Sequence, residues 1–67
     1  MASLVEMIDD LRKAWKVELD SAPNGDAIVR LHDKEAGANG DKMVFSYCGP
    51  ILYRVVSRAW AGQPPDF

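Results

Sequence analysis

One stretch, Met43 to Trp60, constrains the fold more than any other part of the chain. It reads MVFSYCGPILYRVVSRAW, is dense in large apolar side chains, and is divided by the pair Gly49-Pro50. Apolar residues before this pair alternate as in a strand, whereas those after it recur at the spacing of a helix face. The stretch therefore predicts a strand over residues 42–48 and a helix over residues 51–61.

Signals at both ends support this helix. Proline is favoured at the first helical position, where its missing N–H leaves no bond unmade, so Pro50 marks the start. Gly62 suits the position just after the last turn, and the prolines that follow cannot continue a helix. Several residues of this segment are β-branched or aromatic and also favour a strand, so a third strand remains an alternative. The apolar face consists of Ile51, Leu52, Tyr53, Val55, Val56, Ala59 and Trp60.

The N-terminal segment predicts an amphipathic helix over residues 4–21. Ser3 and Glu6 match the capping box, in which the two residues reciprocally satisfy free backbone donors at a helix start. At about 100° per residue, the apolar side chains fall on one arc of the helical wheel. The residues of this arc are Leu4, Met7, Ile8, Leu11, Ala14, Trp15, Leu19 and Ala22.

Three residues depart from the helical pattern. Glu18 falls near the apolar arc, and Val5 and Val17 fall near the polar one. They are either tolerated at the edges of the helix or, in the case of the two valines, belong to a contact surface for a partner.

The middle of the chain predicts an antiparallel hairpin. Residues 22–26 (APNGD) carry turn chemistry and end the first helix. Residues 27–32 alternate as a half-buried strand, and residues 34–41 form a loop with a tight turn at Asn39-Gly40. Strands joined by so short a loop should pair antiparallel.

Together these elements predict a small α+β domain over residues 1–62, in the order α-β-β-α. Two amphipathic helices pack on one face of the hairpin, since a hairpin alone is only marginally stable. Trp15, Phe45 and Trp60 would then be buried together, and residues 63–67 would form a flexible tail. The alternative is α-β-β-β with a three-stranded antiparallel sheet.

Composition limits the function. The chain has 67 residues and one cysteine, so no disulfide can form within it. Cys48 and His32 are the only strong zinc ligands, where four are normally needed, so we expect neither a metal nor another cofactor. The N-terminal residues carry acids rather than a basic region, and no apolar run is long enough to span a membrane. We therefore expect a cytoplasmic protein without a membrane partner.

No residue pattern indicates an enzyme. His32 is the only histidine, and no spacing to Ser46 or Ser57 suggests a catalytic triad. Cys48 stands in an apolar run without a basic neighbour, as a small hydrophobic residue does. Adjacent acids on the first helix point about 100° apart and therefore do not form a pair for acid–base catalysis.

Charged positions on the two helices are the candidate partner-binding residues. Acids on the first helix can dock on a basic groove of a larger protein, and two arginines four residues apart on the second helix can hold phosphate or carboxylate groups. The formal net charge of -2 disfavours direct binding to nucleic acid. The candidates are Glu6, Asp9, Asp10, Arg54 and Arg58.

In size, acidic single-domain character and lack of catalytic residues, the chain resembles small phage-encoded proteins, among them anti-CRISPR inhibitors. The resemblance is one of overall profile along the whole chain. It implies an inhibitor or adaptor that covers a surface on a larger protein or nucleoprotein complex, in the host cytoplasm if the chain is phage-encoded. The alternatives are a weak nucleic-acid or phosphate binder acting through the two arginines, and a structural homodimer.

Overall fold

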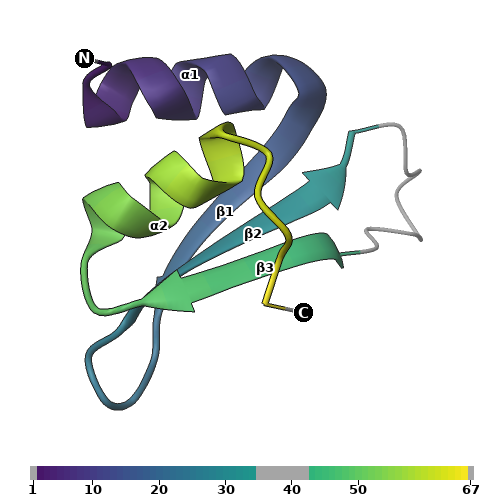
Figure 1. Ribbon diagram of the computed structural model, residues 1–67. Helices are drawn as coiled ribbons and strands as arrows, with labels where there is room; N and C mark the ends of the chain where they lie inside the picture. The colour runs from purple at the N-terminus through teal and green to yellow at the C-terminus, as the bar shows by residue number, and fades with distance from the viewer. Residues whose placement is uncertain (1, 35–42, 67) are drawn as a thin grey trace.

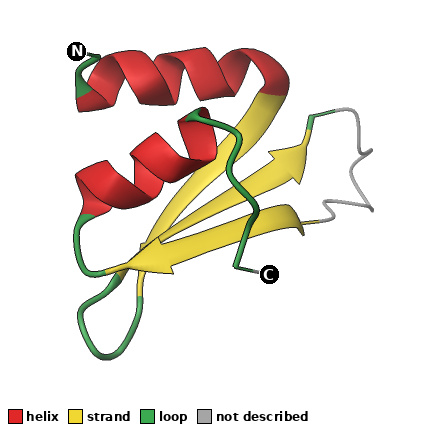
Figure 2. Ribbon diagram, in the orientation of Figure 1, coloured by secondary structure: helices red, strands yellow, loops and turns green. Residues whose placement is uncertain are grey.

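The computed structural model describes residues 2–34 and 43–66, which form two helices and a three-stranded antiparallel sheet (Figures 1 and 2). This is the small α+β domain that the sequence predicts. The strand order in the sheet is β1-β2-β3, so each strand lies beside its neighbour in sequence. The elements are α1 (Leu4–Ala14), β1 (Trp15–Ser21), β2 (Ala27–Asp33), β3 (Met43–Gly49) and α2 (Leu52–Trp60).

The predicted helix over residues 4–21 is wrong in its last third. α1 ends at Ala14, and the following residue, Trp15, has an extended backbone and begins β1. β1 pairs with β2 over its whole length, from Trp15 opposite Asp33 to Ser21 opposite Ala27. The segment WKVELDS alternates apolar and polar residues, and this period of two fits a strand as well as a helix edge. Pairing with β2 decides between the two periods.

The N-terminal end of α1 agrees with the prediction. The Ser3 side chain accepts a hydrogen bond from the Glu6 backbone N–H at 3.1 Å, as an N-cap residue does.

The helices lie over one face of the sheet, with α1 and α2 side by side (Figure 1). The predicted hairpin is confirmed, since β2 and β3 pair antiparallel with Val29 opposite Tyr47 and Leu31 opposite Phe45. These four side chains point toward the helices, and Ile28 and Cys48 lie on the opposite face. The predicted turn at Asn39-Gly40 falls outside the described residues.

α2 settles the choice between helix and strand for the C-terminal segment. It begins one residue later than predicted, because Ile51 keeps an extended backbone (φ -126°, ψ 115°) and serves as the N-cap. Its end is as predicted: Gly62 has a φ of 75° and donates to the Ala59 carbonyl, while Gln63 donates to the Arg58 carbonyl. This is the Schellman arrangement, in which a glycine takes the left-handed conformation at little cost.

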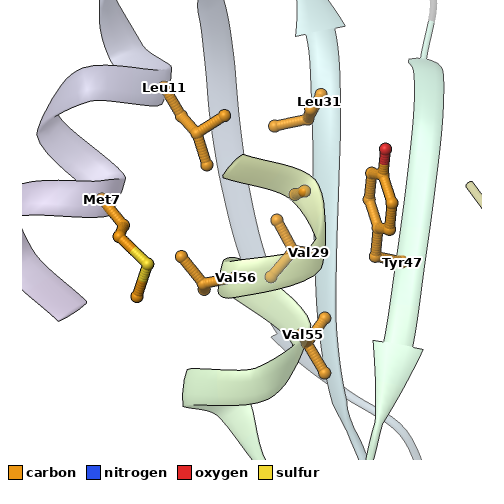
Figure 3. Close-up of a cluster of buried hydrophobic side chains, with 8 residues drawn as sticks. Met7, Leu11, Val29, Leu31, Tyr47, Val55 and Val56 are labelled. Atoms are coloured by element: carbon orange, nitrogen blue, oxygen red, sulfur yellow. The ribbon is translucent and has the colours of Figure 1, made fainter. Parts of the chain in front are cut away.

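The buried core lies between the helices and the central strand (Figure 3). Trp15 and Phe45 pack edge to face beside it, with ring centroids 5.4 Å apart, as the sequence predicts. Trp60 does not join them: it is 45% exposed, because it lies at the margin of the apolar arc of α2. The buried residues are Met7, Leu11, Val29, Leu31, Tyr47, Val55, Val56 and Ala59.

The segment after α2 crosses β3, and Asp66 near its end bonds to the outer edge of this strand (Figure 1). Asp66 donates its backbone N–H to the Ser46 carbonyl at 2.9 Å, and Tyr47 donates its hydroxyl to the Gln63 carbonyl at 2.7 Å. Flexibility of residues 63–67 stays a prediction, but these bonds give residues 63–66 a defined place against the sheet.

Truncation of Met7 should destabilise the fold severely. Met7 is 1% exposed, and replacing a buried methionine with alanine costs about 2–5 kcal/mol. A core of this size rarely supplies more than about 3–5 kcal/mol of net stability, so Met7→Ala should lose much of it and unfold at a far lower urea concentration. Val5→Ala is the matched control on the same helix, since Val5 is 67% exposed. Urea titration followed by circular dichroism measures both; equal midpoints would contradict the packing described.

Candidate interaction surface

The three acidic candidates lie on the solvent side of α1. Glu6, Asp9 and Asp10 are all exposed. Asp9 lies 4.0 Å from Arg12, and Asp10 lies 3.5 Å from Lys13, in both cases between a guanidinium or ammonium nitrogen and a carboxylate oxygen. Exposed pairs of this kind contribute little to stability and leave the carboxylates accessible.

Asp10 also joins the two helices. Trp60 donates its indole N–H to Asp10 Oδ2 at 2.8 Å, across the junction between α1 and α2. This hydrogen bond favours the charged carboxylate, and with the nearby Lys13 it holds the pKa of Asp10 below its usual value. The contact explains why Trp60 is absent from the core: its ring covers the junction, while its polar end finds a partner on α1.

Tyr53 makes a second bridge at the other end of the junction. Its hydroxyl donates to the Ala2 carbonyl at 2.7 Å. Tyr53 and Trp60 are seven residues apart, which is two turns along the same side of α2. The two rings, 36% and 45% exposed, form what we call the aromatic seam. Two large side chains are thus held in place at one end and accessible to solvent over much of their surface.

The two arginine candidates differ in their contacts. Arg58 Nη2 contacts Asp66 Oδ1 at 2.9 Å, and Arg58 Nη1 donates to the Cys48 carbonyl at 3.2 Å. Its guanidinium also lies 5.8 Å from the centroid of the Tyr47 ring. Arg58 therefore fixes the C-terminal segment to β3. Arg54 is exposed and forms no hydrogen bond or ion pair with the described residues.

A charged cluster on the opposite face of the sheet has no counterpart in the sequence predictions. Arg30 Nη1 lies 3.0 Å from Asp20 Oδ2 and 3.5 Å from Glu18 Oε2, and His32 Nε2 lies 2.9 Å from Glu18 Oε1. The Arg30 hydrogen bond lowers the pKa of Asp20. The β1–β2 register brings these side chains together, with Glu18 directly opposite Arg30. A helix over residues 15–21 would not bring these side chains together, so the sequence prediction missed the cluster.

A shallow cavity of about 410 Å³ adjoins this cluster, between the β1–β2 turn and β3. Its lining mixes apolar and polar groups and includes Arg30 and Cys48, but Arg30 is already paired with acids. Within the described parts of the chain, no three His, Cys, Asp or Glu side chains are arranged to hold a metal ion. The remaining lining residues are Ala22, Asn24, Asp26, Ile28 and Ser46.

Comparison with protein families, with curated protein sequences and with solved structures finds no match to this chain. Among the described residues, no helix has the length and apolar character needed to cross a membrane.

The bond between Trp60 and Asp10 can be tested through the titration of the carboxylate. Trp60→Phe keeps an aromatic ring and removes the N–H, so the pKa of Asp10 should rise toward its ordinary value of 3.8. Carbon-detected NMR of the aspartate side chains measures the shift. Asp20, whose hydrogen bonds are on the opposite face, is the internal control and should titrate unchanged. An unchanged pKa for Asp10 would contradict the hydrogen bond.

The Arg58–Asp66 contact should make stability depend on pH. The Arg58 hydrogen bond, followed by one from the Cys48 N–H, holds the pKa of Asp66 below the value of 3.8 expected in the unfolded chain. A carboxyl with a lowered pKa stabilises the fold above its unfolded pKa, and this contribution disappears as the pH falls through the folded value. Arg58→Gln and Asp66→Asn should therefore show coupling at neutral pH.

A double-mutant cycle followed by urea titration measures this coupling, which should weaken as the pH falls below 3.8 and through the lowered folded pKa of Asp66. Coupling that stays the same in acid, or additive effects at neutral pH, would show that the contact does not stabilise the fold.

Proposed function

We propose that the protein is a non-enzymatic protein–protein interaction module that covers a surface on a larger partner, as an inhibitor or adaptor. The observation that carries this proposal is the aromatic seam. Tyrosine and tryptophan are over-represented among residues that dominate binding energy. Tyr53 and Trp60 are anchored by hydrogen bonds to Ala2 and Asp10, so little side-chain freedom is left to lose on binding.

The charges beside the seam indicate the kind of partner. Glu6 and Asp10 are four residues apart and so lie on the same side of α1, and Asp10 accepts the hydrogen bond from Trp60. Asp9 lies about 100° further around the helix. A basic surface on a larger protein would complement these acids, including one that normally binds nucleic acid. The proposed partner is therefore a larger protein or nucleoprotein complex.

The arginines support this proposal better than the alternative of phosphate binding. A phosphate site built on two arginines needs both guanidinium groups to be accessible, whereas Arg58 is bound to Asp66 and the Cys48 carbonyl. Of the two arginines, Arg54 is the one that stays exposed and makes no hydrogen bond or ion pair with the described residues. A lone arginine on a chain of net negative charge gives little affinity for nucleic acid.

The compartment that we propose is the cytoplasm, or the host cytoplasm if the chain is phage-encoded. Cys48 is a free cysteine, as is usual where thiols stay reduced.

The test begins with capture of partners by the tagged protein in extracts of the source cell and ends with one purified partner. Trp60→Ala should weaken binding to that partner by at least about fivefold, since truncation of such an anchor costs more than about 1 kcal/mol. Val5→Ala is the control, because Val5 is exposed on α1 but lies on the side away from the seam. Calorimetry measures the affinities, with circular dichroism as the check on folding. Equal affinities for both variants would reject the seam as the binding surface.

Charge reversal tests the acidic rim separately. Glu6→Lys should weaken binding, and more strongly at low salt, because long-range attraction to a basic partner is screened by salt. Arg54→Glu is the opposite charge reversal, on α2, and should weaken binding less or strengthen it. Arg58 is unsuited to this test because its substitution breaks the contact with Asp66. A loss of affinity that is independent of salt would exclude a basic partner surface.

A further inference from the structure

The two edge strands of the sheet differ in the hydrogen bonding of their outer sides. The edge of β3 is occupied by the C-terminal segment: Asp66 donates to the Ser46 carbonyl and accepts from the Cys48 N–H at 2.9 Å. β1 forms the other edge, and no described strand pairs with its outer side. An unpaired edge presents a row of free N–H and C=O groups to any other strand.

The hydrogen-bonding pattern shows which groups point outward. Ala22 donates its N–H to the Asp26 carbonyl at 2.8 Å, immediately after the pairing of Ser21 with Ala27. Bonded and non-bonded pairs alternate along an antiparallel ladder, so the even-numbered residues of β1 bond to β2. The N–H and C=O groups of Val17 and Leu19 therefore point to the open edge.

Little in β1 prevents further pairing. It has seven residues, with neither proline nor glycine to interrupt it. Its apolar side chains, Trp15, Val17 and Leu19, point to the helix side of the sheet, and Leu19 is still 43% exposed there. A second strand placed alongside would cover this leucine.

We propose that two copies of this chain join through β1, paired antiparallel about Val17, to form one six-stranded sheet. The sequence of β1 is complementary to itself in this register. Lys16 lies opposite Glu18 of the second copy, and Trp15 lies opposite its Leu19; symmetry repeats both pairs. Opposite charges and an aromatic–aliphatic pair are the cross-strand neighbours that stabilise a sheet.

Charge excludes the neighbouring registers. Pairing about Glu18 places two glutamates directly opposite each other, and pairing about Leu19 places Glu18 opposite Asp20. Like charges in these positions are destabilising. Sliding one strand past the other by a single residue, which moves the two-fold axis by half a residue, would set the apolar face of one copy against the charged face of the other. This inference is independent of the proposed function, because the aromatic seam lies on the helix layer and not on the edge of β1.

The first experiment measures molar mass by sedimentation equilibrium over concentrations that detect a dissociation constant from about 1 µM to about 1 mM. The protein should approach twice its monomer mass of 7.4 kDa as concentration rises. Leu19→Pro removes an outward-pointing N–H and should abolish the dimer, while an edge strand tolerates proline at such a position. Leu19→Thr keeps the N–H and should still dimerise. A monomer at every concentration, or a dimer that survives Leu19→Pro, overturns the proposal.

A second experiment tests the register. With Cys48 replaced by alanine, an introduced cysteine can form a disulfide with the same cysteine of the second copy only if it lies near the two-fold axis. Val17→Cys should therefore form a disulfide-linked dimer on mild oxidation. Leu19→Cys should not, because the two Leu19 positions are about 13 Å apart in this register. Cross-linking at Leu19→Cys, or at neither position, overturns pairing about Val17.

Discussion

Burial of the central strand beneath the two helices is the contact on which the other features depend. Val29 and Leu31 are 0% and 2% exposed, and α2 brings Val55 and Val56 against this strand from the helix side. A chain of 67 residues with no disulfide has few other sources of stability. Once α2 is fixed by this core, its margins are fixed too, and they carry the groups that define the surface: the aromatic seam toward α1 and Arg58 toward β3.

The segments predicted correctly are those in which local pattern and tertiary contact agree. The strand before Gly49-Pro50 could be predicted from its alternation, and the helix after it from spacing and end signals that agree, although its β-branched residues left a strand as the alternative. Residues 15–21 were not predicted correctly, since Trp15 and Leu19 satisfy helical spacing as well as alternation. Two of the three residues that depart from the helical pattern, Val17 and Glu18, are explained by the strand. The decisive interaction is the hydrogen-bonded pairing of β1 with β2, which the sequence alone does not show.

The candidate site was predicted in part, for a related reason. Periodicity tells which side chains share a face of one element, but not what lies beside that face. The acids of α1 were placed correctly on its solvent side. Trp60 was assigned to the core because it is large and apolar, whereas its partner, Asp10, is 50 residues away in sequence. The sequence makes Arg58 a binding candidate because no acid lies near it along its helix, whereas its partner, Asp66, lies in a segment predicted to be a tail.

The structure leaves two surfaces available, and they do not compete. The aromatic seam lies over the junction of α1 and α2, while the open edge lies along β1. A two-fold axis perpendicular to the sheet would keep both helix layers on the same side, so a paired molecule would present two seams in the same direction. Two linked binding surfaces bind a repetitive partner far more tightly than either does alone, provided that the spacing fits. Self-association would then strengthen partner binding without a single new contact to the partner.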